Sequence, residues 1–545
     1  MPSYGPGQLT GLRAYGLPSA HTTVQWMGLT LNDPLTGQTD FSEVYPLLFS
    51  DELQIQSIGQ RGGMQIDLTP RLMFSNSSIK GSGHLTERFG LGCFSSAYIR
   101  RRSTRGNIRL LKLTNTNRYR IPHPQGLRYQ QHASKNLFGV SAAITTPIST
   151  RSHSTVAAFF NTDHRQIPPT IDQQASSATL TTSRKAIALT LQHHATKAAT
   201  LLLQTGTMHY RIRYNDTPRQ IHFQARTFEQ QLTPAVRIQL GKHILTRIET
   251  QWHLQQARST GFVDAVSRWI LRPKARLTID QKSFTMHISA GGLITAPERF
   301  QWLGQWSLSR SVLPHWSIAL GINRIARLPS FNDLFWFEGG NPDLQTEHGF
   351  GSNLAIGYRS GEQLHLQVNG FFRQINDFIQ WIPQRGLFRA TQIPSIRSWG
   401  ATATASSQIH PNLRISAVWT YTRSIFLHNR LPNDDIRGKQ LLYVPLHQGS
   451  IEAEATFKDW TFQLLVTGAT ERYITTDNSR ALPPYLLAHA TAEYAFQRWK
   501  IPLRAMLSVE NLTDRYYELY SGWPMPGRRL HVRLTTEYNF NHQKS

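Results

Sequence analysis

The chain has 545 residues, a single cysteine and a formal net charge of +25, with 58 Lys and Arg against 33 Asp and Glu. One thiol, Cys93, excludes a disulfide framework and a Cys-x-x-Cys zinc site. No run of about 18 apolar residues is present, so no transmembrane helix is expected. The basic charge leaves nucleic acid, anionic lipid and an anionic small ligand open as partners.

Residues 1–70, taken by their pattern alone, indicate a small β domain ahead of a much longer β region. The opening stretch, MPSYGPGQLTGLRAYG, has no basic segment followed by an apolar one, so it lacks the pattern of a secretory signal.

From about residue 65 onward, apolar and polar residues alternate, which is typical of strands with one apolar and one polar face. In 207–215 the apolar face holds Met208, Tyr210, Ile212 and Tyr214. Polar composition predicts a loop over 165–186. Other alternating stretches are 283–291, 364–372, 412–422 and 528–540.

This alternation fits two all-β architectures. Soluble β domains would bury the apolar face between sheets, whereas a transmembrane barrel would turn it to lipid and keep the polar face inside. The barrel is favoured because the alternation runs on without a linker, the polar face is rich in Arg, Gln, His and Asn, and Trp and Tyr recur near strand ends. About 22 strands would leave roughly 21 residues for each strand and connection, and a spanning strand needs about 9–11.

Three motifs in the second half of the chain resemble TonB-dependent outer-membrane receptors. RLPSFNDLFWFEGGNPDLQTEHG (327–349) is similar to a family segment in which a strand ends before a GNP turn. Its aromatic residues are expected to pack within a structured loop or against the barrel rim. GKQLLYVPLH (438–447) resembles a family strand. ENLTDRYY and PMPGR (510–517 and 524–528) resemble the last hairpin, whose closing strand ends at Phe540.

The beginning of the chain resembles the second half of the family's plug domain, through Arg13, His21, Thr22, Gly28 and the LNDPLTGQTDFS stretch at 31–42. Ala14 and Trp26-Met27 depart from the family pattern. The resemblance leaves the family's signal peptide, TonB box and first plug strands unmatched. Either Met1 is a misassigned internal start, which is favoured, or the receptor is truncated.

The resemblance implies a large antiparallel transmembrane β-barrel of about 22 strands at 71–540, a partial plug at 1–70 and a short tail at 541–545. It implies a Gram-negative outer-membrane receptor, not an enzyme, that imports a scarce bulky ligand with energy from a TonB-type coupling protein. The ligand is cobalamin-like or a ferric siderophore. The alternative is a degenerate or passive barrel without energised transport, and a soluble basic β-protein is the third possibility.

Two further expectations follow from the resemblance. Ligand should bind at plug turns that face outward, where small polar residues allow close backbone approach. Phe540 would be the signal that the barrel-assembly machinery recognises, and outer-membrane lipid or lipopolysaccharide would surround the barrel. The ligand residues are Ser3, Tyr4, Gly5, Gln8, Asn32, Asp33, Thr36 and Gln38; each of them could instead simply form a tight turn.

Other chemistries find little support. No GxGxxG, Walker, GxSxG or HExxH motif occurs. The 22 histidines lack ligand spacing, so neither a metal site nor a cofactor is expected. Nucleic-acid binding would need arginines clustered with aromatic residues on one face. Here the arginines are spread along the chain, which fits a lumen lining, contact with lipopolysaccharide phosphates, or an anionic ligand.

Overall fold

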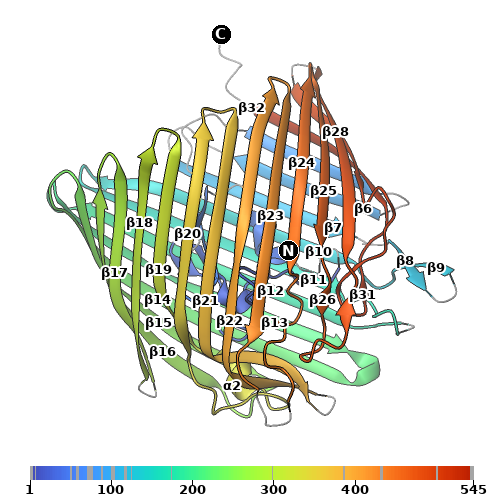
Figure 1. The fold of residues 1–545 in the computed structure, drawn as a ribbon, viewed down its shortest axis with the longest axis horizontal. Coiled ribbons are helices and arrows are strands. Elements are labelled where there is room, and N and C mark those ends of the chain that lie inside the picture. The colour runs from blue at the N-terminus through green and yellow to red at the C-terminus, as the bar shows by residue number, and fades with distance from the viewer. Residues whose placement is uncertain are drawn as a thin grey trace.

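A ring of 22 antiparallel strands forms the wall of the molecule (Figure 1). Each wall strand pairs with its neighbours, and β7 pairs with β10 to complete the circuit. The predicted all-β antiparallel barrel is therefore confirmed. The computed structural model describes residues 4–5, 8–48, 52–56, 60–69, 78–86, 90–99, 105–115, 119–123, 126–173, 175–296, 299–384, 387–429, 434–498 and 501–539.

The wall strands are long enough to cross a membrane at a tilt, since a spanning strand needs about 9–11 residues. In chain order they are β5 (Ser78–Thr86), β6 (Gly90–Ile99), β7 (Arg105–Asn115), β10 (Lys135–Ser149), β11 (Ser152–Gln166), β12 (Thr179–His194), β13 (Ala199–Asp216), β14 (Ile221–Gln239), β15 (Ile244–Ser259), β16 (Val266–Asp280), β17 (Phe284–Thr295), β18 (Arg299–Leu313), β19 (Trp316–Arg327), β20 (Glu347–Ser360), β21 (Leu364–Gln384), β22 (Leu387–His410), β23 (Leu413–Phe426), β24 (His447–Phe457), β25 (Trp460–Ala469), β28 (Tyr485–Arg498), β29 (Ile501–Glu510) and β32 (Arg529–Asn539).

The connections between wall strands differ in length at the two ends of the barrel. At one end, which we call the short-turn end, strands join through turns such as 314–315 and 411–412. At the other, the long-connection end, they join through 328–346, 427–446 and 511–528. Outer-membrane barrels place short turns toward the periplasm and longer loops outside the cell. The long connections carry α2 (Phe331–Phe335), β26 (Arg472–Tyr473), β27 (Ala481–Leu482), β30 (Glu518–Tyr520) and β31 (Trp523–Pro524), and β8 (Arg120–His123) and β9 (Gly126–Tyr129) join β7 to β10.

The wall has an apolar outer face and a polar inner face. On β15, Trp252 is 52% exposed and the next residue, His253, is 4% exposed. Period-two alternation produces this contrast because successive side chains leave a strand on opposite sides. Exposed apolar side chains also include Ile187, Ile451, Leu464 and Leu534, and buried polar ones include Arg184, Gln231, Asn353 and Arg373.

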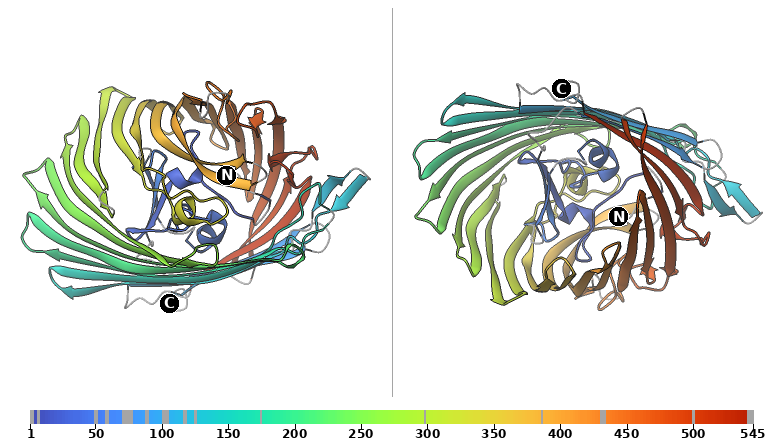
Figure 2. Two further views of the ribbon diagram at one scale, coloured as in Figure 1. Left: turned by 90° about the horizontal axis from the view of Figure 1, so that it is seen from below. Right: turned by 90° about the horizontal axis from the view of Figure 1, so that it is seen from above.

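A segment at 8–69, the inner segment, lies within the ring (Figure 2). Its sheet has the order β2-β1-β4-β3, with β1 and β4 parallel and the other pairs antiparallel. Trp26, Leu29 and Leu31 form a buried cluster with wall residues such as Phe159 and Met208. The elements are η1 (Ser19–His21), β1 (Thr23–Trp26), β2 (Leu29–Thr30), α1 (Phe41–Leu48), β3 (Glu52–Gln56) and β4 (Gln65–Thr69).

Two sequence expectations about β12 and β13 are wrong. Strand β12 begins at Thr179, so only the first part of 165–186 is a connection. The face of β13 with Met208 and Tyr210 points inward, where both residues are buried against the inner segment. The inner sheet presents an apolar surface here, and the inward side chains of β13 that pack on it are apolar. Because side chains alternate between the two faces of a strand, the basic side chains of β13 face outward.

Two of the sequence expectations concern residues outside the described part: Ser3 and Phe540, together with the tail 541–545. Among the described residues, no helix combines the length and apolar character needed to cross a membrane.

Candidate functional site

The turn that follows β2 carries four of the eight predicted site residues. Asn32 bridges this turn: its Nδ2 donates to the carbonyls of Thr22 (2.8 Å) and Gly37 (3.0 Å), and its Oδ1 accepts from the backbone N–H of Val24 (2.9 Å). Gly37 has φ of 73°, a conformation in which glycine carries no steric cost. The side-chain amide of Asn32 therefore forms its hydrogen bonds within the fold.

Asp33 in the same turn is also buried. Its Oδ1 accepts from the Leu35 N–H (3.2 Å) and from the Thr227 hydroxyl of β14 (3.0 Å). Burial raises the pKa of Asp33 to about 6. Thr36 and Gln38 are half-buried and lie nearer to solvent than Asn32 and Asp33.

This turn docks on helix α2, in the aromatic stretch that the sequence singles out. The N–H groups of Phe331 and Asn332 donate to the carbonyls of Pro34 (3.0 Å) and Leu35 (2.9 Å). Ser330 and Asp333 form a capping box that begins the helix. The expected packing in a structured connection holds for Phe331, which is buried against Leu35, whereas Phe335 and Phe337 are exposed.

Tyr4, Gly5 and Gln8 approach the same end of the barrel from another side. The Tyr4 ring stacks on Tyr520 with ring centroids 4.1 Å apart, and Trp523 packs edge-on at 5.6 Å. Gly5 has φ of 135°, a region essentially limited to glycine. Gln8 donates through Nε2 to the Gln166 carbonyl (2.9 Å).

The structure thus brings both groups of predicted residues to the long-connection end. They are linked inside the inner segment, since Thr10 accepts from the Phe41 N–H (3.0 Å) and donates its own N–H to Asp40 (3.1 Å). Gln8, Asn32 and Asp33 are about 2% exposed, whereas Tyr4, Thr36 and Gln38 are half-buried. Of these residues, only the half-buried ones retain appreciable accessible surface.

A buried ionic cluster joins η1 to the wall near α2. His21 Nε2 lies 2.7 Å from Glu347 Oε2, and Arg327 pairs with the same carboxylate. Burial lowers the pKa of His21, against the opposing effect of Glu347. Arg327 and Glu347 both belong to wall strands, so the contact between His21 and Glu347 is the one that ties the inner segment to the wall in this cluster.

A second buried cluster holds α1 against β11. Arg165 Nη2 lies 2.7 Å from carboxylate oxygens of Asp40, Glu43 and Asp163. Lys135 Nζ lies 3.1 Å from Asp163. Burial together with the charge of Asp40 raises the pKa of Glu43 to about 7. For Asp40, burial alone would raise the pKa, but Arg165 and Lys135 outweigh it and hold the pKa below its usual value.

Sequence reasoning missed both clusters. Their inner-segment members lie more than a hundred positions from their wall partners, as with Asp40 and Arg165, and no spacing rule connects them. The sequence carried only a weak signal for these clusters. It was the presence of a charged residue at an inward position of a strand whose other inward residues are uncharged.

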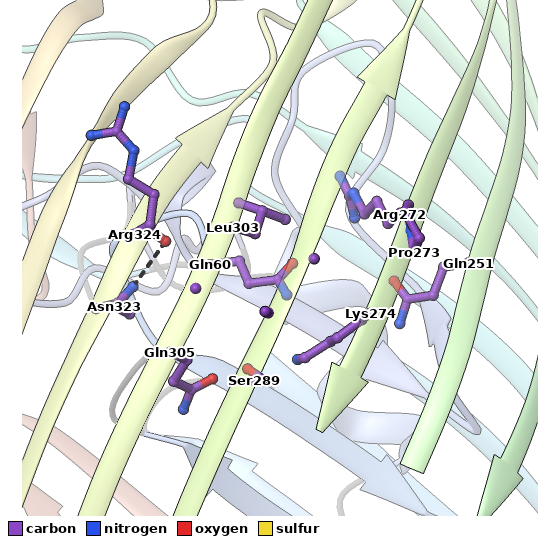
Figure 3. A pocket seen from close by; sticks show the side chains of 13 residues that line it. Gln60, Gln251, Arg272, Pro273, Lys274, Ser289, Leu303, Gln305, Asn323 and Arg324 are labelled. Atoms are coloured by element: carbon purple, nitrogen blue, oxygen red, sulfur yellow. Dashed lines mark hydrogen bonds between the residues drawn. The ribbon is translucent and has the colours of Figure 1, made fainter. Parts of the chain in front are cut away.

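A polar cavity of about 350 Å³ lies between the inner sheet and the wall from β13 to β19. Figure 3 shows the adjoining space, into which Gln60, Lys274 and Gln305 project. A further cavity of about 410 Å³ shares Arg276 and continues toward β21. The charged residues lining the 350 Å³ cavity are Arg61, Asp67, Arg247, Glu249, Arg272, Lys274 and Arg276.

The lining is strongly basic. Arg247 and Glu249 pair with each other (2.7 Å), whereas Arg272, Lys274 and Arg276 form no ion pair with any residue in the described ranges. Burial and three neighbouring arginines lower the pKa of Arg61 to about 9. Five of the seven charged lining residues are basic, and such an excess of positive charge in a cleft favours anions.

Metal binding by protein side chains finds no support in the part of the chain that the structure describes, which holds no group of three His, Cys, Asp or Glu residues placed around one ion. The interior offers aromatic and hydrogen-bonding groups at the long-connection end and cationic side chains deeper inside.

Comparison with known proteins identifies the architecture. A family described as "TonB dependent receptor-like, beta-barrel" matches residues 66–512. The iron transporter FrpB from Neisseria meningitidis superposes with a TM-score of 0.81 at 11% identity, over 98% of this chain and 94% of that one. The ferric enterobactin receptor from Pseudomonas aeruginosa gives 0.75 at 13% identity, over 97% and 94%.

One curated relative is the iron-regulated outer membrane virulence protein of Vibrio cholerae serotype O1. It is 24% identical over 230 residues, which are 37% of this chain and 32% of the relative. The match therefore spans about a third of that relative's length.

Proposed function

Because this chain belongs to the TonB-dependent receptor family, we propose that it imports a bulky anionic metal chelate of the ferric siderophore class across the Gram-negative outer membrane in which it lies. The proposed role is transport, and no catalytic step is part of it. Energy for import would come from a TonB-type coupling protein. The name of the Vibrio relative, which calls it iron-regulated, supports iron as the metal.

In this proposal residues 1–70 act as a plug and 71–540 as the barrel. The contact between His21 and Glu347 and the ion pairs of Arg165 with Asp40 and Glu43 keep the plug seated. Both clusters join inner-segment residues to wall residues, so displacing the plug must break them. That requirement accounts for a need for external energy, since buried pairs are costly to separate.

Ligand would first bind at the long-connection end. Among the predicted residues, Tyr4, Thr36 and Gln38 are half-buried and would contact the ligand directly, whereas Gly5 is buried and would shape the turn. Ser3 remains part of the proposed site. Gln8, Asn32 and Asp33 would act indirectly by holding the turns in position, because each is buried and its side chain forms hydrogen bonds within the fold. A Tyr4–Tyr520–Trp523 aromatic surface suits a ligand with planar rings.

The basic cavity is the single observation that carries the ligand class. Arg272, Lys274 and Arg276 line it without ion-pair partners among the described residues, beneath the proposed entry site. A negatively charged chelate would be stabilised there on its way to the short-turn end, whereas an uncharged ligand would gain little.

Two further partners belong to this proposal. The barrel-assembly machinery would recognise the end of β32 at Phe540, and lipopolysaccharide would contact the outer wall. Nucleic acid is not among the proposed partners.

The test is uptake by cells that lack their own receptors for the chosen ligands and express this chain with a signal peptide. Three ligands are compared: a trianionic ferric tris-catecholate, a neutral ferric hydroxamate and cobalamin. We expect the anionic chelate to enter fastest, with about a tenfold advantage corresponding to about 1.4 kcal/mol. Equal uptake of the neutral chelate, or a preference for cobalamin, would overturn the proposed ligand class.

A further inference from the structure

Six basic side chains gather on the outer face of β12 to β15. We call them the outer basic patch: Lys185, His209, Arg211, Arg213, Arg226 and Arg258. The register of the sheet makes them neighbours, since Lys185 lies opposite His209, Arg211 opposite Arg226, and Arg226 opposite Arg258.

The adjacent residues along each strand show that the patch points away from the barrel interior. Arg184, Tyr210, Thr227 and Ala257 are all buried against the interior, at 1–6% exposure. Side chains alternate between the faces of a strand, so residues next to these positions face outward. The outward direction also follows from exposure, since Lys185, Arg226 and Arg258 are exposed.

Arg211, Arg226 and Arg258 form a row across three strands, and this arrangement is unfavourable on its own. Like charges directly opposite each other on antiparallel strands destabilise the sheet. No described carboxylate forms an ion pair with any member of the patch. The Nε of Arg211 is moreover buried without a hydrogen-bond partner among the described atoms. The row therefore lacks a compensating anion among the described residues of the chain.

The position of the patch along the strands indicates where that anion comes from. Toward the short-turn end, the same outer face carries exposed apolar residues, among them Ile187, Leu201, Ile248 and Trp252. The patch begins where this apolar belt stops and continues toward the long-connection end. In an outer-membrane barrel that level is the headgroup region of the outer leaflet.

We propose that the outer basic patch binds the phosphate groups of lipopolysaccharide, with the lipid A acyl chains lying on the apolar belt below. Guanidinium groups match phosphate oxygens with paired hydrogen bonds, and three of them in a row can hold a phosphorylated disaccharide in one orientation. This site does not involve the transported ligand, so a test of lipopolysaccharide binding does not depend on the proposed transport.

The test is equilibrium binding of lipid A to the purified full chain in detergent, measured at low salt. Wild-type protein should bind bisphosphorylated lipid A saturably, and added NaCl should weaken the binding because exposed charges are screened. The double variant Arg211→Gln/Arg226→Gln should bind about tenfold or more weakly, as expected for lost charge-assisted hydrogen bonds. The matched control, Lys242→Gln/Arg310→Gln, removes two exposed cations at the short-turn end and should bind like wild type.

Two further ligands separate phosphate recognition from general lipid adhesion, and they need only the wild-type protein. Dephosphorylated lipid A should bind much more weakly than the bisphosphorylated form, and inorganic pyrophosphate, which lacks acyl chains, should also bind weakly. Equal binding of dephosphorylated lipid would overturn the proposal, as would an equal loss in the control variant. Pyrophosphate binding as tight as that of lipid A would show a site for free phosphate and would overturn the lipid assignment.

Discussion

At the residue scale, Glu43 is the most informative titrating group. Its carboxylate contacts Arg165 (2.7 Å), the Thr182 hydroxyl (2.8 Å) and the Tyr210 hydroxyl, and Asp40, Asp163 and Arg184 lie nearby. Its pKa is raised from 4.5 to about 7, so between these values the folded protein holds a proton that the unfolded chain releases. The attachment of α1 is therefore strongest below pH 4.5 and weakens as the pH rises to 7, by up to about 3 kcal/mol.

We expect amide hydrogen exchange in α1 to be faster at pH 8 than at pH 5.5, after correction for the intrinsic pH dependence of exchange. Glu43→Gln should remove this difference. Asp33→Asn is the matched control, because Asp33 titrates near pH 6 in a different turn. It should leave α1 unchanged and alter only the 32–38 turn. The Asp40 pKa is lowered, so Asp40 titrates below this window. A pH dependence of α1 that persists in Glu43→Gln would contradict the assignment.

At the element scale, helix α2 is the contact that positions the proposed entry site. Phe331 is 1% exposed and packs on Leu35 of the docked turn, whereas Phe337 in the same connection is 67% exposed. Phe331→Ala should destabilise this contact by about 3–5 kcal/mol, because a buried ring is lost and a cavity remains. Phe337→Ala should change stability by less than about 0.5 kcal/mol.

Limited proteolysis of the folded protein measures this difference. Cleavage within 32–38 should be faster in Phe331→Ala than in wild type, and unchanged in Phe337→Ala. Similar cleavage of the two variants would show that α2 does not hold the turn.

The elements also show what the sequence could and could not predict. Strands such as 364–372 and 412–422 were predicted correctly, because alternation is a local property. The inward face of β13 was not predicted correctly, because the direction of Met208 depends on packing against an apolar inner sheet that is distant in the sequence. The partners of Arg165 were missed for the same reason. The predicted site residues were located, but their ligand contacts remain a prediction.

At the scale of the whole molecule, two groups of cations within the basic chain lie in places that the fold separates. One set of cations lines the interior cavity, where Arg276 belongs to both adjoining spaces. Another set, the outer basic patch, faces outward at the edge of the apolar belt that lies toward the long-connection end. The alternation of a strand separates the two sets, so one basic composition can serve an anionic ligand inside and anionic lipid outside.

The measurement that tests energised import most directly is uptake of a radiolabelled anionic ferric chelate by cells expressing this chain, with and without a functional TonB protein. Surface binding is measured in parallel on cells without metabolic energy. We expect surface binding in both strains and uptake only in the strain with TonB. Equal uptake in the two strains would contradict the account, and would show a passive barrel through which the chelate diffuses.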